Sequence, residues 1–403
     1  MYVNVAVLKE THAHERRVAL VPALVAKLLK LGARLHMQSG AAAAIHLDDA
    51  AYADVAFDAD RHALVKDADV VLCVQPPALD VVDAMKAGAI LVCFVYAHNE
   101  PALVKRLLER RVTCFAMERV PRISRAQAMD ALSSQSALAG YYAVQVGSTQ
   151  LARVVPKITS AAGSIGPARV LVMGLGVAGL EAIATAHRLG AIVEGYDVRP
   201  ETREQALSLG ASFVDTGVDA TGQGGYAREL NADETARVAT VLTRHIQNAD
   251  LIITTAAIPG RPAPKLVSHD QVAGMKSGAV IVDLSAEGGG NCEDTRPGLT
   301  TRVGRVTIVA PLNVPSLLGE DASELYAKNV YNLLALMMKD NVVEIDWSDE
   351  ILARTVLTHA GENKGDASDR AARAAATAAP AGAARHPKPA APALPAPPAP
   401  TAA

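Results

Sequence analysis

The sequence predicts an α/β protein built from two doubly wound, parallel-sheet domains of Rossmann-like type with a cleft between them. Short apolar runs of strand length alternate with stretches at helical spacing, which is the pattern of a parallel sheet covered by helices. The alternation runs from the start of the chain to about Val120 and restarts near Ala168, after a long intervening segment. The restart indicates a second sheet rather than an extension of the first.

The first domain is predicted to be discontinuous, with residues 1–126 completed by about residues 323–357. Strands are predicted in "YVNVAVLKE", "ADVVLCVQPP" and "GAILVCFVYA", and helices in "PALVAKLLKLGA" and "PALVKRLLERR". Apolar residues are contiguous in the strand runs and recur every three or four positions in the helices. The later stretch "SELYAKNVYNLLALMMKD" is apolar at helical spacing, so it is predicted to pack back on this domain.

The second domain is predicted over residues 127–322, and a disordered tail over residues 361–403. The second domain begins with an expected long helix and continues with strands in "ARVLVM", "AIVEGYDV", "ADLIITT", "GAVIVDL" and "RVTIVA". In the tail, 8 of the 22 prolines fall in the last 24 residues, and most of the other residues there are alanine. Such a segment cannot bury enough apolar surface to offset the entropy lost on ordering.

Composition excludes several classes of function. The 403 residues carry a formal net charge of -3 and no long Lys/Arg run, so no nucleic-acid partner is expected. The four cysteines are scattered without CxxC spacing, so no metal site and no disulfide framework are predicted. The N-terminal residues lack a signal-peptide pattern, and no run of 18 apolar residues occurs. A cytoplasmic protein without a membrane span is therefore expected.

The stretch "PRISRAQAMDALSSQ" places four polar groups close together in the sequence: Arg122, Gln127, Asp130 and Ser133. If the segment is helical, the last three share one narrow face, because they follow at intervals of three. One interpretation is a solvated cluster of caps and ion pairs at a helix start. The alternative is a set of groups that holds a ligand.

A glycine-rich turn predicts a dinucleotide site. Gly174, Gly176 and Gly179 have GxGxxG spacing directly after an apolar strand and before an amphipathic helix, which is the arrangement that receives a pyrophosphate at a helix N-terminus. The next strand ends in Asp197, 18 residues beyond the last of these glycines, where a carboxylate accepts from the adenosine ribose. That carboxylate repels a 2′-phosphate, so NAD is favoured over NADP, although the nearby Arg199 weakens this preference.

Three further segments are predicted to wall the nicotinamide half of the pocket: "AAIPGRPAP", "DLSAEGGGNCE" and "APLNVPS", which follow strands of the second domain. Within them Glu287 and Asn313 are equally interpretable as turn-forming residues with local hydrogen bonds. Tyr226 lies on the glycine-rich loop "TGQGGYAREL", where it either closes over the cofactor or is simply exposed. The complete set predicted to bind the cofactor is Gly174, Gly176, Val177, Ala178, Gly179, Asp197, Val198, Arg199, Tyr226, Ala256, Glu287 and Asn313.

In combination these stretches resemble a known family over about residues 3–350. The motifs "PRISRAQAMDALSSQ", "GVAGLEAIATAHRLGA", "YDVRP", "GGYA", "IPGRPAPKL", "VIVDLSAEGGGNCE" and "LYAKN" look like the NAD(H)-binding domain I, or soluble alpha-1 subunit, of proton-translocating NAD(P) transhydrogenase, which is related to alanine dehydrogenase. By that resemblance Arg122, Asp130 and Ser133 orient the nicotinamide carboxamide, and Gln127 bridges toward a second nucleotide. These four form the implied catalytic set.

The resemblance also implies the partners. It indicates an oxidoreductase of the Si-specific/Re-specific, proton-translocating type that is active only with partner subunits. NAD(H) would bind to this chain and NADP(H) to a separate subunit, while membrane-embedded subunits would translocate protons. A homodimer, peripheral to the inner (plasma) membrane, is implied for the chain itself.

Two other functions remain as alternatives. An alanine dehydrogenase-like oxidoreductase needs a cation and an acid/base near the substrate. Arg17 is retained, but that enzyme's lysine and histidine fall on Gln75 and Tyr96, so Lys9, Glu10 and Arg17 are interpreted as structural ion pairs. A non-catalytic NAD-sensing module would not need the four polar residues of the implied catalytic set together. Departures from the transhydrogenase pattern occur at Tyr142, Leu312 and Leu317.

Overall fold

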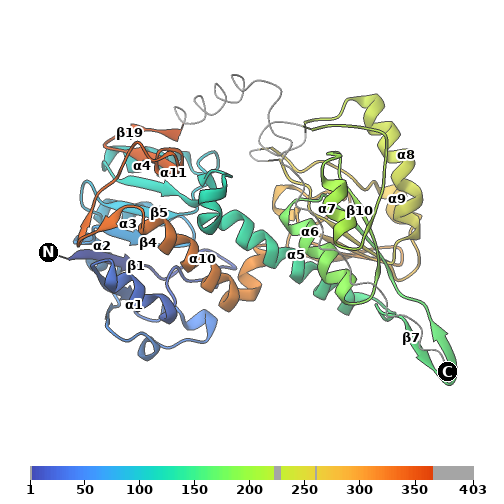
Figure 1. Ribbon diagram of the computed structural model, residues 1–403, viewed down its shortest axis with the longest axis horizontal. Coiled ribbons are helices and arrows are strands. Elements are labelled where there is room, and N and C mark those ends of the chain that lie inside the picture. The colour runs from blue at the N-terminus through green and yellow to red at the C-terminus, as the bar shows by residue number, and fades with distance from the viewer. Residues whose placement is uncertain (1, 222–227, 259–260, 366–403) are drawn as a thin grey trace, which may run out of the picture.

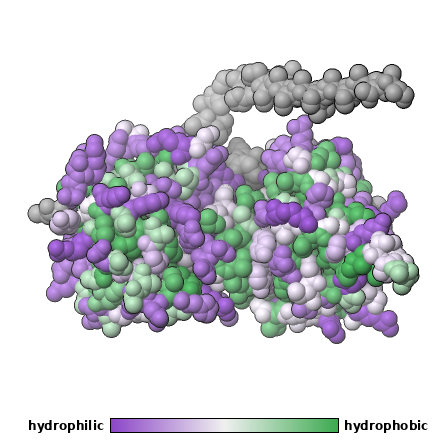
Figure 2. Space-filling view, turned by 60° about the horizontal axis from the view of Figure 1, so that its bottom comes forward, coloured by the Kyte–Doolittle hydropathy of each residue, from purple (hydrophilic) through white to green (hydrophobic). Residues whose placement is uncertain are grey.

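The computed structural model describes residues 2–221, 228–258 and 261–365, which form two α/β domains (Figure 1). Each domain is a mainly parallel sheet with helices on both faces, so the predicted fold class is confirmed. Figure 2 shows the two domains as neighbouring lobes. Among the described residues, no helix combines the length and the apolar character needed to cross a bilayer.

The sheet of the first domain has eight strands in the order β19-β18-β6-β5-β4-β1-β2-β3. The pairs from β3 through β6 are parallel, whereas β18 runs antiparallel to β6 and β19 antiparallel to β18. The strands are β1 (Val3–Val7), β2 (Ala33–Gln38), β3 (Val55–Asp58), β4 (Val70–Leu72), β5 (Ile90–Cys93), β6 (Thr113–Ala116), β18 (Val356–His359) and β19 (Glu362–Asn363).

Two apolar clusters hold helices to the two faces of this sheet. One joins it to α1 (Pro22–Lys30), α10 (Gly319–Leu334) and α11 (Glu350–Thr355). The other joins it to α2 (Arg61–Lys66), α3 (Leu79–Ala84) and α4 (Pro101–Glu109). The helix predicted after residue 323 therefore does pack on the first domain, although it begins at Gly319.

The chain beyond α11 closes the edge of this sheet. β18 pairs with β6, and the strand β19 that follows lies inside the range predicted for the tail. Lys364 N donates to Leu357 O at 2.8 Å, and Arg119 Nη2 donates to Gly365 O at 3.1 Å. Residues 366–403 of the predicted tail lie outside the described residues.

The sheet of the second domain has seven strands in the order β11-β10-β9-β12-β13-β15-β14, and only β14 is antiparallel to its neighbour. Numbered along this domain, the parallel strands have the order 3-2-1-4-5-6 of a dinucleotide-binding sheet, whose order reverses beside its first strand, β9. The strands are β9 (Arg169–Met173), β10 (Ile192–Tyr196), β11 (Ser212–Phe213), β12 (Leu251–Thr254), β13 (Val280–Asp283), β14 (Thr300–Val303) and β15 (Val306–Val309).

Helices cover both faces of the second sheet as well. On one face lie α5 (Ala131–Gln150), α6 (Val177–Arg188) and α7 (Thr202–Ser208). On the other lie α8 (Ala232–Asn248) and α9 (His269–Ala273). The remaining elements are β7 (Ile158–Ser160), β8 (Gly163–Ile165), β16 (Met338–Lys339), β17 (Val342–Val343) and the 3₁₀ helices η1 (Ala43–Ile45), η2 (Asp49–Ala51), η3 (Met117–Arg119), η4 (Ser124–Met129), η6 (Ala286–Gly288) and η7 (Val314–Leu318).

Helix α5 runs from the first domain into the second (Figure 1). Near its start, Ser134 Oγ donates to Asn329 Oδ1 of α10 at 2.8 Å. Further along, a Cβ at Gly140 would overlap the carbonyl group of Ala178, and one at Gly147 would lie 2.6 Å from Leu251 Cδ1. The two glycines therefore let α5 pack closely on the second domain while its start is fixed to the first.

Candidate nucleotide site at the facing edges of the two sheets

The carboxyl ends of the strands in both sheets meet at one place. Glu15 and Arg17 follow β1 of the first sheet, and Asn313 follows β15 of the second. Arg17 Nη2 donates to Asn313 Oδ1 at 3.2 Å, and Asn313 Nδ2 donates to Glu15 Oε2 at 3.0 Å. Ligands of open parallel sheets bind beyond the carboxyl ends of the strands, so both domains present their ligand-binding edges here.

The glycine turn between β9 and α6 has the geometry of a phosphate cradle. Gly174 has φ of +96°, and a Cβ there would lie 2.8 Å from Thr255 Oγ1. A Cβ at Gly179 would overlap the carbonyl oxygen of Gly174, so this glycine lets helix and strand pack. A Cβ at Gly176 meets no described atom within 4 Å, which leaves the approach to the turn open.

Helix α6 begins at Val177, immediately after this open position, and continues with Ala178. Gly176 is its N-cap residue and has no side chain to accept from the first N–H groups of the helix. The positive end of the helix and these N–H donors suit an anion. The turn therefore fits the pyrophosphate of a dinucleotide.

Asp197 closes the other side of the turn and is 8% exposed. Its Oδ2 accepts from Leu175 N at 2.7 Å and from Arg199 Nη2 at 2.7 Å. Its Oδ1 accepts from Arg199 N and Arg199 Nε, both at 2.9 Å. The carboxylate predicted to receive the ribose thus binds the glycine turn and an arginine, and its role toward a nucleotide stays a prediction.

Asn291 ties together the loops that follow β12 and β13, a role that the sequence analysis missed. It is fully buried, its Oδ1 accepts from Ala256 N at 3.0 Å, and its Nδ2 donates to Ala256 O at 2.8 Å. Asn291 N donates in turn to the buried carboxylate of Asp283 at 2.7 Å. The polar residue at the end of "AEGGGN" was the available signal.

Val198 lies on the chain after β10, and its carbonyl accepts from Ala220 N at 2.9 Å.

Glu287 and Asn313 have the local hydrogen bonds of the turn-forming alternative. Glu287 Oε1 accepts from Asn313 N at 2.7 Å. Asn313 has φ of 43°, in the left-handed region that asparagine tolerates, and precedes η7. Its side chain contacts Glu15 and Arg17 of the first domain, so it also joins the two domains.

The stretch that carries the implied catalytic set is not one continuous α-helix. Residues Ser124–Met129 form the 3₁₀ helix η4, and α5 begins after Asp130, which has ψ of 87°. Asp130 instead caps α5, because Oδ1 accepts from Ser133 N at 2.9 Å and Oδ2 from Ser133 Oγ at 2.6 Å. The structure thus brings Asp130 and Ser133 together, and it leaves the side chains of Arg122 and Gln127 exposed nearby.

The first domain fixes η4 from both sides. Asn329 Nδ2 and Asn332 Nδ2 of α10 donate to Ala128 O at 2.9 and 3.1 Å. Arg125 of η4 binds both carboxylate oxygens of Asp349 at 2.7 and 2.8 Å, and Asp349 caps α11. The backbone that carries Gln127 is therefore held in place although that side chain is exposed.

Glu15 and Arg17 form a buried ion pair at the centre of the interdomain contact. Arg17 Nε and Nη2 donate to Glu15 Oε1 and Oε2 at 2.8 and 2.7 Å, and Arg17 Nη1 donates to Gln135 of α5 at 2.8 Å. Burial alone would raise the pKa of Glu15, but hydrogen bonds and charge from Arg17 outweigh it and lower that pKa to about 2. The predicted ion pair of Arg17 exists, although Glu15, its partner, and Gln135 were missed.

Glu10, interpreted from the sequence as part of an ion pair, accepts from backbone N–H groups, and Arg17 pairs with Glu15 instead. Glu10 Oε1 accepts from Val74 N at 2.6 Å and its Oε2 from Gln75 N at 3.2 Å. Burial raises the pKa of Glu10 to about 8, with a smaller contribution from the charge of Glu15. Near neutral pH this carboxyl group is therefore mostly protonated.

The two positions that distinguish alanine dehydrogenase lie at the same edge of the first sheet. Gln75 Nε2 donates to Glu15 Oε2 at 2.8 Å. Tyr96 has φ of 48° and stacks on Phe94 with ring centroids 5.7 Å apart. Glu118 Oε1 accepts from Tyr96 N at 2.7 Å, which holds this backbone.

The three departures from the transhydrogenase pattern are half-buried residues. Leu312 packs on Gly298, where a Cβ would lie 3.1 Å from Leu312 Cδ1, while Tyr142 and Leu317 are half-buried. Tyr226 lies outside the described residues.

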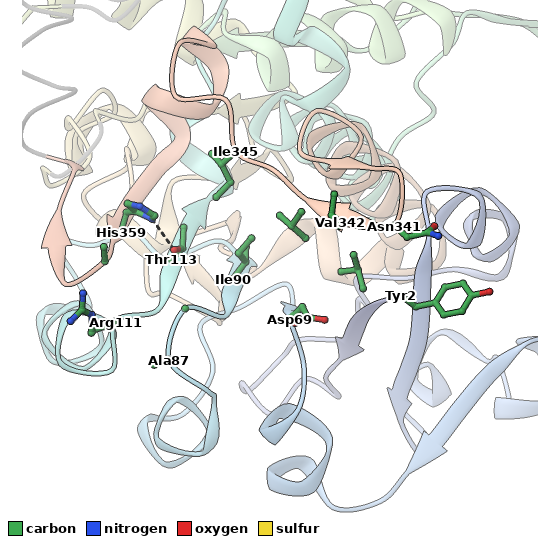
Figure 3. Close-up of a pocket in the computed structure, with 14 residues that line it drawn as sticks. Tyr2, Asp69, Ala87, Ile90, Arg111, Thr113, Asn341, Val342, Ile345 and His359 are labelled. Atoms are coloured by element: carbon green, nitrogen blue, oxygen red, sulfur yellow. Dashed lines mark hydrogen bonds between the residues drawn. The ribbon is translucent and has the colours of Figure 1, made fainter.

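A separate pocket opens at the opposite, amino edge of the first sheet (Figure 3). Its walls include Asp69, Ile90 and Arg111, and Thr113 Oγ1 lies 3.0 Å from His359 Nδ1 within it. None of the predicted site residues lines this pocket. Position and lining both separate it from the glycine turn.

The strand order and the glycine turn define a two-domain protein with a Rossmann-like nucleotide-binding domain. Comparison with known proteins agrees: a model of the alanine dehydrogenase/PNT N-terminal domain matches residues 6–139, and one of the C-terminal domain matches residues 143–364. The chain belongs to the alanine dehydrogenase/PNT family.

Within this family the chain is more similar to transhydrogenase subunits than to alanine dehydrogenases. An NAD(P) transhydrogenase alpha subunit of Rhodospirillum rubrum is 43% identical over 373 residues, covering 89% of this chain and 97% of that protein. The transhydrogenase structure from Sinorhizobium meliloti is 38% identical, with a TM-score of 0.78 over 89% of this chain and 98% of that one. The alanine dehydrogenase of Halomonas elongata is 31% identical over 306 residues, covering 73% and 75%. The resemblance noted from the motifs is thereby confirmed.

Proposed function

We propose that this chain is the NAD(H)-binding, alpha-type subunit of a proton-translocating transhydrogenase. Hydride passes between NADH on this chain and NADP⁺ on a partner subunit, and membrane-embedded subunits couple the transfer to proton translocation. The chain acts at the cytoplasmic face of the inner (plasma) membrane, held by those subunits. The relatives of similar length named as transhydrogenase alpha subunits support this assignment.

The observation that carries the proposal over the alanine dehydrogenase alternative is the charge balance around Arg17. An amino or keto acid needs a cation for its carboxylate. The guanidinium of Arg17 is instead bound at both carboxylate oxygens by Glu15, and the neutral Gln75 adds no charge. The pair is internally neutralised, so the carboxylate of a small organic acid would have to displace Glu15 to bind Arg17.

The residues near the start of α5 then act by position. Bound NADH supplies the hydride. Asp130 and Ser133, already joined to each other, present a carboxylate and a hydroxyl to the carboxamide, and Arg122 lies on the loop before them. Gln127 is exposed on the anchored η4 and directed to the second nucleotide. Such contacts set the separation and orientation of the two rings, on which the transfer rate depends.

A single-turnover measurement tests the proposal. The chain is loaded with NADH and mixed with the NADP-binding subunit of a transhydrogenase, and reduction of an NADP analogue is followed. Gln127→Ala should slow transfer at least about tenfold while leaving NADH affinity nearly unchanged, because affinity depends mainly on the glycine turn. Gln150→Ala, at the far end of α5, is the matched control.

Two results would contradict the proposal. Absence of transfer by the wild-type chain with a competent partner would remove the assigned activity. NAD-dependent oxidation of alanine by the chain alone would restore the alanine dehydrogenase alternative. A third function, a non-catalytic NAD sensor, predicts NADH binding without transfer, and the same experiment would reveal it.

A further inference from the structure

The carboxylate expected to recognise the ribose is already paired. Asp197 and Arg199 are two residues apart, and the guanidinium spans both carboxylate oxygens through Nε and Nη2 at 2.9 and 2.7 Å. The Asp197 side chain is 5% exposed and that of Arg199 16%. A planar fork bound in this way is the strongest form of such a pair.

This pairing saturates the carboxylate. An ionised carboxylate has about four acceptor positions. Each oxygen of Asp197 accepts two hydrogen bonds, and one of the four comes from Leu175 in the glycine turn. A ribose hydroxyl group that donates to Asp197 must take the place of one of these donors, and the two side-chain N–H groups of Arg199 are more easily moved than the two backbone N–H groups.

The displaced guanidinium stays close to the ribose. Its backbone is fixed, because Arg199 N donates to Asp197 Oδ1 and Arg199 O accepts from Thr202 Oγ1 at 2.8 Å. The position beside the 2′-hydroxyl is where an arginine receives the 2′-phosphate in NADP-binding sites. The two side chains therefore exert opposite effects on the same atom of the ligand.

We propose that Arg199 is a specificity-determining residue of this site: its pairing with Asp197 sets how strongly the chain rejects a 2′-phosphate. While the pair is intact, the carboxylate is neutralised and its repulsion of NADPH is reduced. Discrimination between the two nucleotides is then a property of the pair rather than of Asp197 alone. The inference rests on the proposed binding of NAD(H) to this chain.

Equilibrium titration of the full chain with NADH and with NADPH tests this. In Arg199→Gln the carboxylate is unshielded, so the ratio of the NADPH to the NADH dissociation constant should rise about tenfold or more. In Asp197→Asn the negative charge that repels a phosphate is removed while the charge of Arg199 remains, so the ratio should fall by a similar factor. Arg199→Lys keeps the positive charge but loses the two-point contact of the guanidinium. Its ratio of the NADPH to the NADH dissociation constant should lie between those of the wild type and Arg199→Gln.

Arg203→Gln is the matched control, because this arginine lies on the adjacent α7 and pairs with the exposed Asp215. Its ratio of the NADPH to the NADH dissociation constant should equal that of the wild type. Thermal unfolding checks that every variant is folded. A ratio that does not change in either Arg199→Gln or Asp197→Asn would overturn this inference while leaving the proposed function intact. Failure of the wild type to bind NADH would instead overturn the proposed function itself.

Discussion

Glu10 and Glu15 show how neighbours decide the charge of a carboxyl group. Both are half-buried residues on the loop after β1, five positions apart in the sequence. Among the described residues, two backbone N–H groups donate to Glu10, and burial raises its pKa to about 8. Burial also acts to raise the pKa of Glu15, but the neighbouring Arg17 outweighs this effect and lowers that pKa to about 2. One group is thus held neutral and the other charged.

Substitution of Glu10 should change how stability depends on pH. Its pKa is raised from 4.5 to about 8, so between these values the folded protein retains a proton that the unfolded chain has released. The free energy of unfolding contributed by Glu10 therefore falls as pH rises through this window and is constant above it. Relative to Glu10→Gln, the wild type should lose on the order of a few kcal/mol between pH 5 and 8.5.

Urea unfolding followed by circular dichroism at several pH values measures this difference. The exposed Glu204 on α7 provides the control, since Glu204→Gln makes the same carboxyl-to-amide change at the surface of the second domain. Parallel curves for Glu10→Gln and the wild type would contradict the raised pKa.

Residue identities could be predicted from the sequence better than their partners. Arg17 and Asp197 stood out by position, and their surroundings were the unpredictable part. Arg17 pairs with Glu15 only because the bend after β1 brings them together, and its contact with Gln135 spans 118 positions. Hydrogen bonds between segments so distant in sequence leave no local pattern.

At the scale of elements, the glycine turn was predictable because Gly174 and Gly179 each answer a steric demand and Gly176 leaves the approach to the turn open. The break before α5 was not, although the spacing of Gln127, Asp130 and Ser133 had suggested one helical face. A capping aspartate accepts from the first N–H groups of a helix and so favours a helix start at that position. A helix that starts at Asp130 cannot also continue through it. The break before α5 also depends on α10, because Asn329 and Asn332 of that helix donate to Ala128 O and hold η4 in place.

The direction of edge strands was likewise beyond the sequence pattern. Alternating strands and helices predict parallel pairs, yet β14 and β18 are antiparallel to their neighbours. β14 and β15 are joined by a short turn through Gly304, which has φ of 58°, and β18 follows α11 and pairs with β6, with β19 outside it at the edge of the first sheet. A short apolar run does not indicate whether a strand at the end of a sheet is parallel or antiparallel to its neighbour.

Two glycine variants should separate folding from binding in the turn. Gly176→Ala adds a methyl group that meets no described atom within 4 Å, so stability should be unchanged while NADH binding weakens about tenfold or more. Gly179→Ala forces its methyl group into Gly174 O and should lower the stability by about 1–3 kcal/mol or more. Calorimetric unfolding and NADH titration of both proteins measure the two effects.

Gly166→Ala is the control, since its methyl group also meets no described atom within 4 Å but lies outside the turn. It should match the wild type in both measurements. Normal NADH affinity in Gly176→Ala would place the pyrophosphate elsewhere.

At the scale of the whole molecule, the hairpin of β7 and β8 projects away from the second domain (Figure 1). Ile158 and Ile165 face each other across it and are 42% and 54% exposed. A two-stranded ribbon is marginally stable alone, and apolar pairs on its surface favour a partner. The homodimer that the family resemblance implies predicts that a second copy of this chain covers this hairpin.

Replacing both isoleucines by serine should therefore convert a dimer into a monomer. Light scattering after size-exclusion chromatography gives the mass directly. Leu299→Ser, which alters another exposed apolar residue on the same domain, should leave the dimer intact. A wild-type protein that is monomeric at micromolar concentration, or a double variant that stays dimeric, would show that the hairpin does not join two copies.

The return of β18 and β19 to the first sheet has a consequence for the order of synthesis. The strand that covers β6 begins at Val356, so about 240 residues, including the whole second sheet, leave the ribosome between the two. Until then β6 is an open edge able to pair with foreign strands. Early folding of the second domain, or a chaperone bound at that edge, would shorten the time for which β6 is exposed.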